Sequence, residues 1–399
     1  MKLSPAMTSP DVRKLFQLLG KGSIRFVGGC VRNTVLGIPV GDIDLATTLL
    51  PAEVIKKLSG AGIRVVPTGL DHGTVTAVMN GIGYEITTLR RDVETDGRRA
   101  VVAFTNDWAE DAARRDFTMN ALYADLDGKV YDPLERGLSD LEKRKVVFVG
   151  DEETRIQEDY LRILRFFRFH SLYAKGAPDK KGLAACTKFS PKISTLSRER
   201  VTQEFTKILM GDAPQRILTV MQTHKILPLI LGKSFHPKRI ASLAKIQKIS
   251  EGSGEVVNFC ARLFIVLGFR YKESEKLSNL LILNKKQISI LFNLSKIKID
   301  TKRIDMVEIA KNLYLYDRQS VAAAVMVAAV KDELSVSAYK KLWAVFVQAE
   351  CPVFQISGKD LMALGIPHGP QIGVELSRLE KLWIKSGFTL GRQALLSRF

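Results

Sequence analysis

The sequence predicts an α+β protein, in which a mixed α/β N-terminal part is followed by a long all-α part. Up to Gly150, runs of alternating apolar and polar residues, which are typical of strands, are interleaved with helical segments. After Gly150, nearly every segment has helical periodicity and ends at helix-stopping residues. With 399 residues, of which 46% are hydrophobic, the chain is long enough for two or more domains with their own cores.

The N-terminal part begins with an apolar strand that ends at a glycine pair. Gly28 and Gly29 lead into a short helix, and Asp42 and Asp44 follow on a second predicted strand. Glycine lacks Cβ, so its backbone N–H group can approach phosphate oxygens where a helix begins and its dipole is positive. Residues two apart on a strand point to the same face, and two carboxylates on one face suit Mg²⁺, which also binds substrate phosphates. This order predicts a site for a nucleoside triphosphate and Mg²⁺.

The next strands are expected to bring a third carboxylate to this site. The run Thr74–Val78 alternates between apolar and polar residues, as a strand does. The run Tyr84–Leu89 is expected to be the second strand of a hairpin, connected to the first through residues 80–83. Glu85 on the returning strand would then lie near the aspartate pair. A helix at Pro51–Leu58 and a strand at Val101–Phe104 complete the expected elements of this part.

The C-terminal part is predicted to be entirely helical. Ser197 is a plausible N-cap for the first of these helices, and Gly211-Asp212 ends it. The Ala-rich run Val321–Val330 is most simply a core helix. The predicted helices are Arg198–Met210, Pro214–His224, Glu255–Leu267, Lys285–Lys296, Asp305–Tyr314, Ser320–Val330 and Val336–Glu350.

Charge is distributed unevenly along the chain. The formal net charge is +18, yet Lys and Arg exceed Asp and Glu by only one in residues 1–150 and by 17 in the remainder. The N-terminal part is nearly neutral and the C-terminal part is strongly basic. This distribution suits a protein that binds a small substrate in its N-terminal part and a polyanion in its C-terminal part. A soluble basic helical domain is the plain alternative. An anionic membrane surface is another polyanion that such a protein could bind. The sequence, however, contains no strongly amphipathic basic helix that is distinct from the helices expected in a globular domain.

Cysteine and histidine usage argues against several classes of site. Four widely scattered cysteines without a C-x-x-C pair indicate neither a zinc site nor a disulfide framework, and five dispersed histidines offer no His-Asp metal spacing. The N-terminus has no apolar signal core, and the longest uncharged apolar run, near Val321–Val330, is too short to span a bilayer. We therefore expect a cytoplasmic protein with no membrane partner, and no protein partner is implied.

Four blocks of residues in the first half of the chain resemble a known family. The blocks are Gly28-Gly-Cys-Val-Arg32 with Asp42-x-Asp44, His72-Gly-Thr-Val with Glu85-Ile-Thr-Thr-Leu-Arg90, Arg114-Arg-Asp-Phe-Thr-Met-Asn120-Ala, and Glu158-Asp-Tyr-Leu-Arg162-Ile-Leu-Arg165-Phe-Phe-Arg168-Phe. In these blocks the chain resembles the tRNA nucleotidyltransferases, the CCA-adding enzymes of the class found in bacteria and eukaryotes, within the poly(A) polymerase/tRNA nucleotidyltransferase family. One departure is visible, because the family usually has an acid after the arginine of the first block and this chain has Asn33; the change bears on local helix packing rather than on catalysis.

The resemblance implies a nucleotidyltransferase head at residues 1–145, a nucleotide-selecting helical neck at 146–210, a helical body at 211–300 and a helical, tRNA-binding tail at 301–399. It implies addition of CCA to the 3′ end of tRNA without a template, from CTP and ATP, with Mg²⁺ as cofactor and pyrophosphate as product. The expected partners are thus the 3′ end and body of tRNA, CTP and ATP.

The resemblance also assigns roles to single residues. Asp42 and Asp44 would hold the metal and, with Glu85, form the catalytic group. Arg32 and Arg115 would be counter-charges for the triphosphate or its sugar, and Asn120 could recognise a ribose hydroxyl. The full expected nucleotide-binding set is Gly28, Gly29, Arg32, Arg115, Asp116, Asn120, Asp159, Arg162, Arg165 and Arg168.

The fourth block is expected to select the base. On a helix, Asp159, Arg162 and Arg165 would lie within an arc of about 120°, while Arg168 would drift to the far side. Cytosine and adenine expose an amino group beside a ring-nitrogen acceptor, whereas guanine and uracil present a carbonyl oxygen there. A carboxylate accepts from the amino group and an arginine donates to the acceptor. Standing alone, such a pair is usually a surface ion pair; the resemblance assigns the selecting role to Asp159 and Arg162.

Other functions remain open from the sequence. A bacterial poly(A) polymerase shares the glycine pair and the aspartates, but usually has a basic run where this chain has residues 67–74. An enzyme that adds only C would lack the flexible loop that residues 91–98 resemble, and an enzyme that adds only A is a further alternative. A non-catalytic RNA-binding protein would not need the two aspartates. Near the C-terminus, residues 356–362 and 368–373 place glycines at predicted helix starts, where N–H groups could meet RNA phosphates, although ordinary capping explains them equally well.

Overall fold

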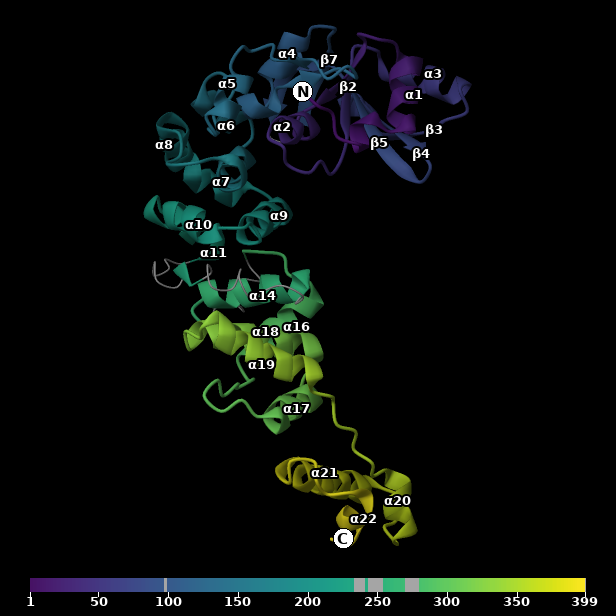
Figure 1. Cartoon of the computed structure of the whole chain (residues 1–399), viewed down its shortest axis with the longest axis vertical. Helices are drawn as coiled ribbons and strands as arrows, with labels where there is room; N and C mark the ends of the chain where they lie inside the picture. Colours follow the sequence, from purple (N-terminus) through teal and green to yellow (C-terminus); the bar gives the residue numbers. More distant parts are fainter. Residues whose placement is uncertain (97–98, 233–240, 243–253, 270–279, 399) are drawn as a thin grey trace. The chain divides into compact units, whose positions relative to one another are not determined.

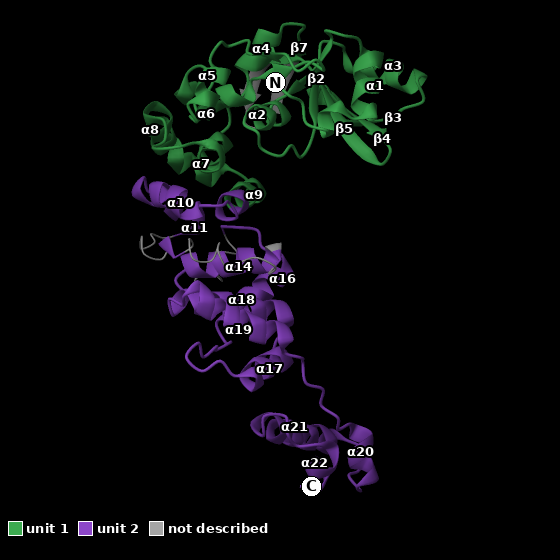
Figure 2. Cartoon of the chain, in the orientation of Figure 1, with its two compact units in different colours: residues 1–205 green, residues 206–399 purple. Residues whose placement is uncertain are grey.

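The computed structural model describes the 399-residue chain except residues 97–98, 233–240, 243–253, 270–279 and 399. The chain divides into two compact units, Met1–Phe205 and Thr206–Phe399 (Figure 2). The first unit is mixed α/β and the second contains helices (Figure 1), which confirms the predicted α+β class. The finer division into head, neck, body and tail stays a prediction.

A seven-stranded sheet forms the centre of the first unit. Its strands are β1 (Ile24–Val27), β2 (Asp44–Thr47), β3 (Arg64–Gly69), β4 (Thr74–Met79), β5 (Ile82–Thr88), β8 (Tyr123–Ala124) and β9 (Val130–Tyr131). Their order in the sheet is β3-β4-β5-β2-β1-β8-β9. β2 and β5 run parallel, whereas the other neighbouring strands run antiparallel. The sheet therefore places the start of β2 beside the middle of β5.

Local chemistry explains how this sheet forms. The predicted hairpin joins β4 to β5 through Asn80 and Gly81, whose φ angles of 50° and 80° suit a two-residue turn. Along β5 the residues alternate, so that Tyr84 and Ile86 are buried and Glu85 is exposed. The alternation turns Glu85 away from the face that holds the core.

A capping residue and a proline define the start of the first helix beside the sheet. Ser9 caps the first helix by accepting from the Val12 N–H group, and Pro10 occupies its first turn. The helices of this region are α1 (Pro10–Leu19), α2 (Gly29–Val35), α3 (Pro51–Gly60), α4 (Trp108–Ala113) and α5 (Gly137–Glu142), with a 3₁₀ turn η3 at Thr118–Asn120.

The segment expected to be a loop is a strand pair. β6 (Arg90–Asp96) pairs antiparallel with β7 (Arg99–Phe104) as a separate two-stranded sheet. The prediction of a strand at Val101–Phe104 is thus confirmed. The prediction of a loop for residues 91–98 is wrong for the part that the structure describes, because residues 91–96 pair with β7.

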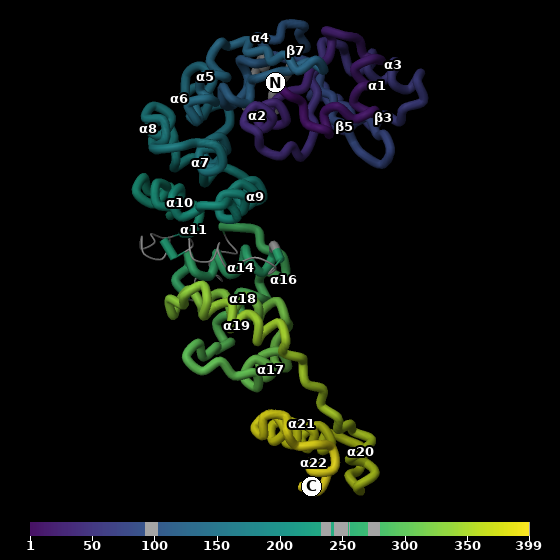
Figure 3. The backbone as a smooth tube through the Cα atoms, viewed as in Figure 1, coloured from purple at the N-terminus to yellow at the C-terminus, as the bar shows by residue number. Residues whose placement is uncertain are grey.

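Four helices follow within the first unit, and Figure 3 traces the backbone through them. Phe166 and Phe167 are fully buried on the second of these helices, and the Phe166 ring stacks on Phe148 at a centroid distance of 5.5 Å. An aromatic core thereby joins this helix to the segment that leaves the sheet. The helices are α6 (Glu152–Glu158), α7 (Leu161–Tyr173), α8 (Lys180–Phe189) and α9 (Arg198–Leu209), the last of which ends in the second unit.

The second unit contains the other helices of the described chain. Its α18 (Arg318–Lys331) is buried over most of its length, as the Ala-rich run predicted, and Asp317 caps it. None of the helices in the described ranges is long and apolar enough to cross a membrane. The remaining helices are α10 (Pro214–Thr223), α11 (Leu227–Leu231), α14 (Glu255–Val266), α16 (Lys285–Leu294), α17 (Met306–Leu315), α19 (Val336–Gln348), α20 (Gly358–Ala363), α21 (Pro370–Lys385) and α22 (Arg392–Leu396).

Candidate active site

Three carboxylates gather where β2 lies beside β5. Asp44 is the first residue of β2 and stands in register with Glu85 of β5. Asp42 precedes the strand in a bend, so of the predicted pair only Asp44 lies on the strand itself. Asp42 and Glu85 are exposed and Asp44 is half-buried. The parallel pairing of β2 with β5, rather than strand periodicity, brings the three acidic residues together.

Electrostatics at this edge favour a cation. Burial raises the pKa of Asp44 above its ordinary value, the negative charges of Glu85 and Asp42 raise it further, and the Arg115 charge opposes them. The residues present therefore fit a divalent metal, since two carboxylates with room for substrate phosphates are the donors that Mg²⁺ prefers. In the described part of the chain, however, no three His, Cys, Asp or Glu side chains are arranged to form a complete metal site by themselves.

The glycine pair lies between β1 and α2. Gly28 has a φ of 66°, a conformation that L side chains rarely adopt, and Gly29 starts the helix. The Gly28 N–H group donates to the carbonyl oxygen of Leu122 over 3.2 Å, so the expectation that it is available to a phosphate is not met here. A Cβ at Gly28 would lie 3.7 Å from Nη1 of Arg115. The Arg115 guanidinium therefore lies beside the helix start, at a distance where a Cβ would make ordinary van der Waals contact with it.

Arg115 is held by a buried acid that the sequence analysis missed. Asp111, in the first turn of α4, is 1% exposed and pairs with Arg114 at 2.7 Å and with Arg115 at 2.9 Å. It also accepts from the Tyr123 hydroxyl over 2.6 Å. Burial alone would raise the pKa of Asp111, but the charges of Arg115 and Arg114 lower it to about 2. The sequence does contain a signal for this acid, because Asp111 stands three and four residues before the two arginines, the spacing at which side chains on a helix are neighbours.

A buried polar network connects α2 to α7 through η3. Nη1 of Arg32 donates to Oδ1 of Asn120 over 2.5 Å, and Nδ2 of Asn120 donates to Oδ1 of Asp116 over 2.9 Å. Asp116 in turn accepts from Nε of Arg165 over 2.8 Å. Arg32, Asn120 and Asp116 are 6%, 7% and 9% exposed. The structure therefore brings four of the predicted nucleotide-binding residues into contact with one another. Their consecutive hydrogen bonds connect the region of the sheet to the helices that follow it.

Arg32 is enclosed by groups without formal charge. Its Nη2 donates to the Tyr173 hydroxyl over 2.7 Å, and the guanidinium lies 4.0 Å from the centre of the Tyr173 ring. Oδ1 of Asn33 accepts from Nε and Nη2 over 3.1 and 3.0 Å. Burial lowers the pKa of Arg32. Asn33 therefore stands where an acid would form an ion pair with Arg32, and Tyr173 is a second residue that the sequence analysis did not single out.

Asp159 and Arg162 are placed differently from the helical prediction. Asp159 lies between α6 and α7 with an extended backbone, φ −155° and ψ 105°, so it does not share a helix with Arg162. Arg162 donates to Oε2 of Glu158 over 2.5 Å and to the Arg155 carbonyl oxygen over 2.9 Å. Its other partner is the Arg114 carbonyl oxygen, at 3.3 Å. The Arg162 N–H group donates to the Asp159 carbonyl oxygen over 2.9 Å, but the side chains of the two residues are held by separate partners.

Helix α9 supplies the ionic partners of two predicted site residues. Arg200 pairs with Oδ2 of Asp159 at 2.6 Å, and Glu204 accepts from Nε of Arg168 over 2.6 Å. Glu204 is 5% exposed. Arg168 therefore faces α9 in this structure. Neither Arg200 nor Glu204 was singled out from the sequence, because both lie about 40 residues from their partners and no short motif contains them.

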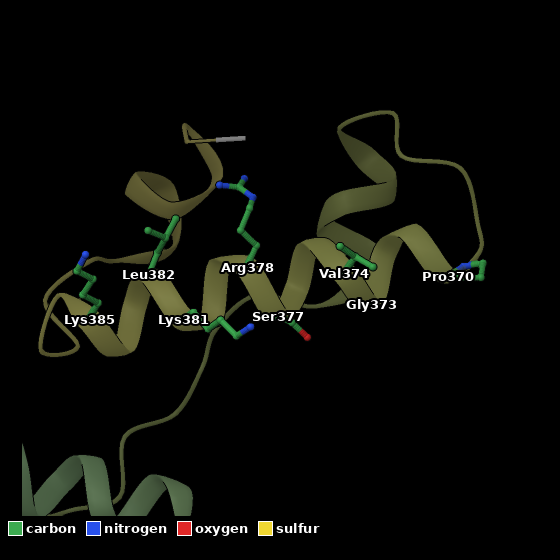
Figure 4. A pocket seen from close by; sticks show the side chains of 8 residues that line it. All are labelled: Pro370, Gly373, Val374, Ser377, Arg378, Lys381, Leu382 and Lys385. Carbon is green, nitrogen blue, oxygen red and sulfur yellow. The ribbon is translucent and has the colours of Figure 1, made fainter.

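A groove lies on α21, the last long helix of the second unit. It has a volume of about 760 Å³ and includes Arg378, Lys381 and Lys385; Leu382 lies between the two lysines along the helix, and Val374 precedes Arg378 (Figure 4). Val374 is 66% exposed. The groove has no acidic lining residue, so it is not the catalytic site. The predicted glycine positions do lie at helix starts here, since Gly358 begins α20 and Gly369 precedes α21.

Sequence comparison identifies relatives over nearly the whole chain. The family models that match are the poly(A) polymerase head domain, at residues 24–147, and a probable RNA and SrmB binding site of polymerase A, at residues 177–236. The CCA tRNA nucleotidyltransferase 1, mitochondrial, of Mus musculus is 32% identical and covers 98% of this chain and 92% of its own. The CCA-adding enzyme of Limosilactobacillus fermentum is 33% identical, over 93% of this chain and 91% of its own.

Solved structures share the fold. The Bacillus stearothermophilus CCA-adding enzyme in complex with CTP superposes with a TM-score of 0.77 at 24% identity, covering 96% of this chain and 94% of its own. The Thermotoga maritima CCA-adding enzyme complexed with tRNA superposes with a TM-score of 0.69 at 20% identity, covering 98% and 95%. From the relatives that are at least 30% identical over nearly its whole length, the chain belongs to the CCA tRNA nucleotidyltransferases, within the family defined by the poly(A) polymerase head domain.

Proposed function

We propose that this protein adds CCA to the 3′ end of tRNA without a template, from CTP and ATP, with release of pyrophosphate. The observation that carries the proposal is the acidic edge of the sheet, where Asp44 in register with Glu85 lies near Arg115 and the glycine pair. Relatives over nearly the whole chain are named CCA-adding enzymes, and poly(A) polymerase activity is not favoured by those names.

The reaction is an in-line displacement. The 3′ hydroxyl of the RNA attacks the α-phosphorus of the nucleotide, the bond to the bridging oxygen breaks, and pyrophosphate leaves. Asp42 and Asp44 would hold Mg²⁺, which supplies charge neutralisation for the phosphates when bound. Arg115, fixed by Asp111 beside the glycine pair, is placed to stabilise negative charge on the triphosphate.

Base selection is assigned to Asp159 and Arg162. The carboxylate accepts from the amino group of cytosine or adenine, and the guanidinium donates to the neighbouring ring nitrogen. In this structure Arg162 donates to Glu158 and to two carbonyl oxygens. Reading a base would therefore require Arg162 to exchange some of these bonds for bonds to the nucleotide. Asn120 and Arg32 are buried in the network with Asp116. We therefore propose that they hold the site in shape, and that their contact with the nucleotide is secondary to this role.

The tRNA body is proposed to contact the basic C-terminal half. Residues after Gly150 carry an excess of 17 positive charges, and the α21 groove presents Arg378, Lys381 and Lys385. Such side chains bind phosphates without reading sequence. This part of the proposal predicts that tRNA binding weakens as the salt concentration rises.

A cytoplasmic location is the last part of the proposal. All four cysteines are free in the structure, which suits a reducing compartment. Several relatives are named mitochondrial forms, so mitochondria are the specific alternative. Fractionation of the source cells with a tagged protein distinguishes the two locations.

An extension assay tests the activity. The protein is incubated with Mg²⁺ and a tRNA that ends at its discriminator base, together with each nucleoside triphosphate singly and all together. We expect two C additions followed by one A, with U and G rejected. Asp42→Ala combined with Asp44→Ala should abolish incorporation, whereas Asp127→Ala, at an exposed ion pair with Lys21, should not.

Each alternative gives a different product. A long A tail would identify a poly(A) polymerase, and a product that stops after CC or that receives only A would identify a partial enzyme. No extension with any divalent ion would leave an RNA-binding protein and would contradict the proposal.

A further inference from the structure

Tyr173, the last residue of α7, contacts a predicted nucleotide-binding arginine but has no role in the reaction described above. Its hydroxyl accepts from Nη2 of Arg32 over 2.7 Å, and the Arg32 guanidinium lies 4.0 Å from the centre of its ring. We propose that Tyr173 is a positioning residue for nucleotide binding, which fixes the Arg32 guanidinium between the glycine pair and Asn120. The proposal rests on the proposed function, since it concerns the nucleotide site of that same reaction.

The Arg32 guanidinium lies where the glycine pair meets the buried polar network. A Cβ at Gly29 would lie 3.7 Å from Nη2 of Arg32, and Nη1 of Arg32 donates to Oδ1 of Asn120 over 2.5 Å. Asn120 in turn donates to Asp116. The place of the positive charge beside the glycines and the orientation of the Asn120 amide therefore both depend on how the guanidinium plane is held.

Only uncharged groups hold this plane in the described part of the chain. Arg32 donates to the Asn120 amide oxygen, to the Tyr173 hydroxyl and twice to Oδ1 of Asn33, over 3.1 and 3.0 Å. Nδ2 of Asn33 donates to the Pro39 carbonyl oxygen over 3.0 Å, which keeps Oδ1 turned toward Arg32. A bidentate ion pair with a carboxylate would fix a guanidinium more firmly than these single bonds. Loss of the Tyr173 hydroxyl is therefore not masked by an ion pair.

The ring of Tyr173 supports the guanidinium separately from the hydroxyl. Tyr173 stands four residues after Phe169, a spacing at which side chains share a helix face, and the two rings stack at a centroid distance of 5.8 Å. The Arg32 guanidinium also lies 5.2 Å from the centre of the Phe169 ring, and Phe169 is 5% exposed. A cation is attracted to the face of an aromatic ring. The two rings thus hold the guanidinium against α7, and the hydroxyl sets its rotation.

The test measures kcat and KM of the purified full-length protein, for CTP on tRNA that lacks CCA and for ATP on tRNA that ends in CC. Tyr173→Phe is expected to raise both KM values by about tenfold, the effect of losing one charge-assisted hydrogen bond, and to leave kcat within about twofold. Tyr173→Leu should raise them by about thirtyfold, because the cation–π contact is lost as well. The ratio of kcat/KM for CTP to that for UTP should stay within about twofold, since the sugar and triphosphate are common to both.

Tyr339→Phe is the matched control. It removes a tyrosine hydroxyl from α19 in the second unit, where the oxygen is buried and has no hydrogen-bond partner among the described residues. This variant should leave both KM values unchanged. An equal rise in KM for Tyr339→Phe and Tyr173→Phe would overturn the proposal, because the effect would then not depend on Arg32.

A rescue experiment separates positioning from a structural role. Asn33→Asp gives up the exposed bond to Pro39, but its carboxylate meets Nε and Nη2 of Arg32 as an ion pair, so the guanidinium stays anchored without the hydroxyl. In this background Tyr173→Phe should raise the KM values by less than about threefold.

Three results would overturn the proposal. They are an equal rise in KM in both backgrounds, unchanged KM values in Tyr173→Phe, and a loss confined to kcat, which is the result expected when part of the protein is unfolded. If circular dichroism shows that Tyr173→Leu is unfolded, Tyr173→Phe decides the outcome, because it keeps the ring. Absence of CCA addition by the unmodified protein would contradict the proposed function, which is a distinct outcome.

Discussion

Replacement of Asp111 by asparagine tests whether the acid behind Arg115 stabilises the fold. Asp111 is 1% exposed, and it pairs with Arg114 and Arg115 and accepts from Tyr123. Asparagine has nearly the same shape but removes the charge, so two largely buried guanidinium groups lose their counter-ion. The expected result is a lower free energy of unfolding and a less ordered Arg115.

The magnitude follows from the pKa of Asp111. Burial opposes ionisation, but the arginines lower the pKa to about 2 from an ordinary 3.8. Because one pKa unit corresponds to about 1.4 kcal/mol, ionised Asp111 contributes about 2 kcal/mol to stability at pH 7. Its folded pKa is the lower one, so this contribution is complete above about pH 4 to 5 and is lost as pH falls toward 2. Breaking a buried ion pair adds to the loss, for a total of about 3 kcal/mol in Asp111→Asn.

Urea denaturation at pH 7, 5 and 3 measures this difference. The gap between the native protein and Asp111→Asn should be about 3 kcal/mol at pH 7 and about 1 kcal/mol smaller at pH 3, where roughly half of the charge contribution is lost. Asp127→Asn, in the exposed pair with Lys21, should leave the free energy of unfolding nearly unchanged at each pH. A gap of less than 1 kcal/mol at pH 7, or one that grows as pH falls, would refute the reasoning.

Three further perturbations have expected outcomes. Asn33→Asp should raise the free energy of unfolding by about 1 kcal/mol, because a carboxylate would meet Nε and Nη2 of Arg32; a lower melting temperature would contradict this. Gly137→Ala should cost about 2 kcal/mol in thermal denaturation, since its Cβ would lie 2.5 Å from the Thr118 carbonyl oxygen, and an unchanged melting temperature would show that the backbone gives way freely. Asp44→Asn should stabilise the metal-free protein while abolishing incorporation, because burial and neighbouring acids raise the pKa of Asp44 and penalise its charge at pH 7; added Mg²⁺ should raise the melting temperature of the native protein more than that of the variant.

Periodicity and punctuation were enough to predict the fold class and most element positions. The hairpin at residues 80–81 and the Ala-rich α18 were recognisable because their signals are local, a turn dipeptide and an uninterrupted helical run. Residues 91–96 were expected to form a loop because residues 91–98 resemble the flexible loop of the family, whereas pairing with β7 stabilises residues 91–96 as a strand. Local propensity is weak where a partner strand supplies the hydrogen bonds.

The candidate site also has features that the sequence could predict and features that it could not. The sequence alone determined which residue types are present and where they lie in the chain, and this was enough to predict that Asp42, Asp44 and Glu85 form one acidic group. Only the tertiary structure decided the partners of these residues, such as Arg200 for Asp159 and Asp111 for Arg115. The physical reason is that an ion pair depends on distance in space and on burial, and residues 159 and 200 become neighbours only when α9 packs beside the junction of α6 and α7.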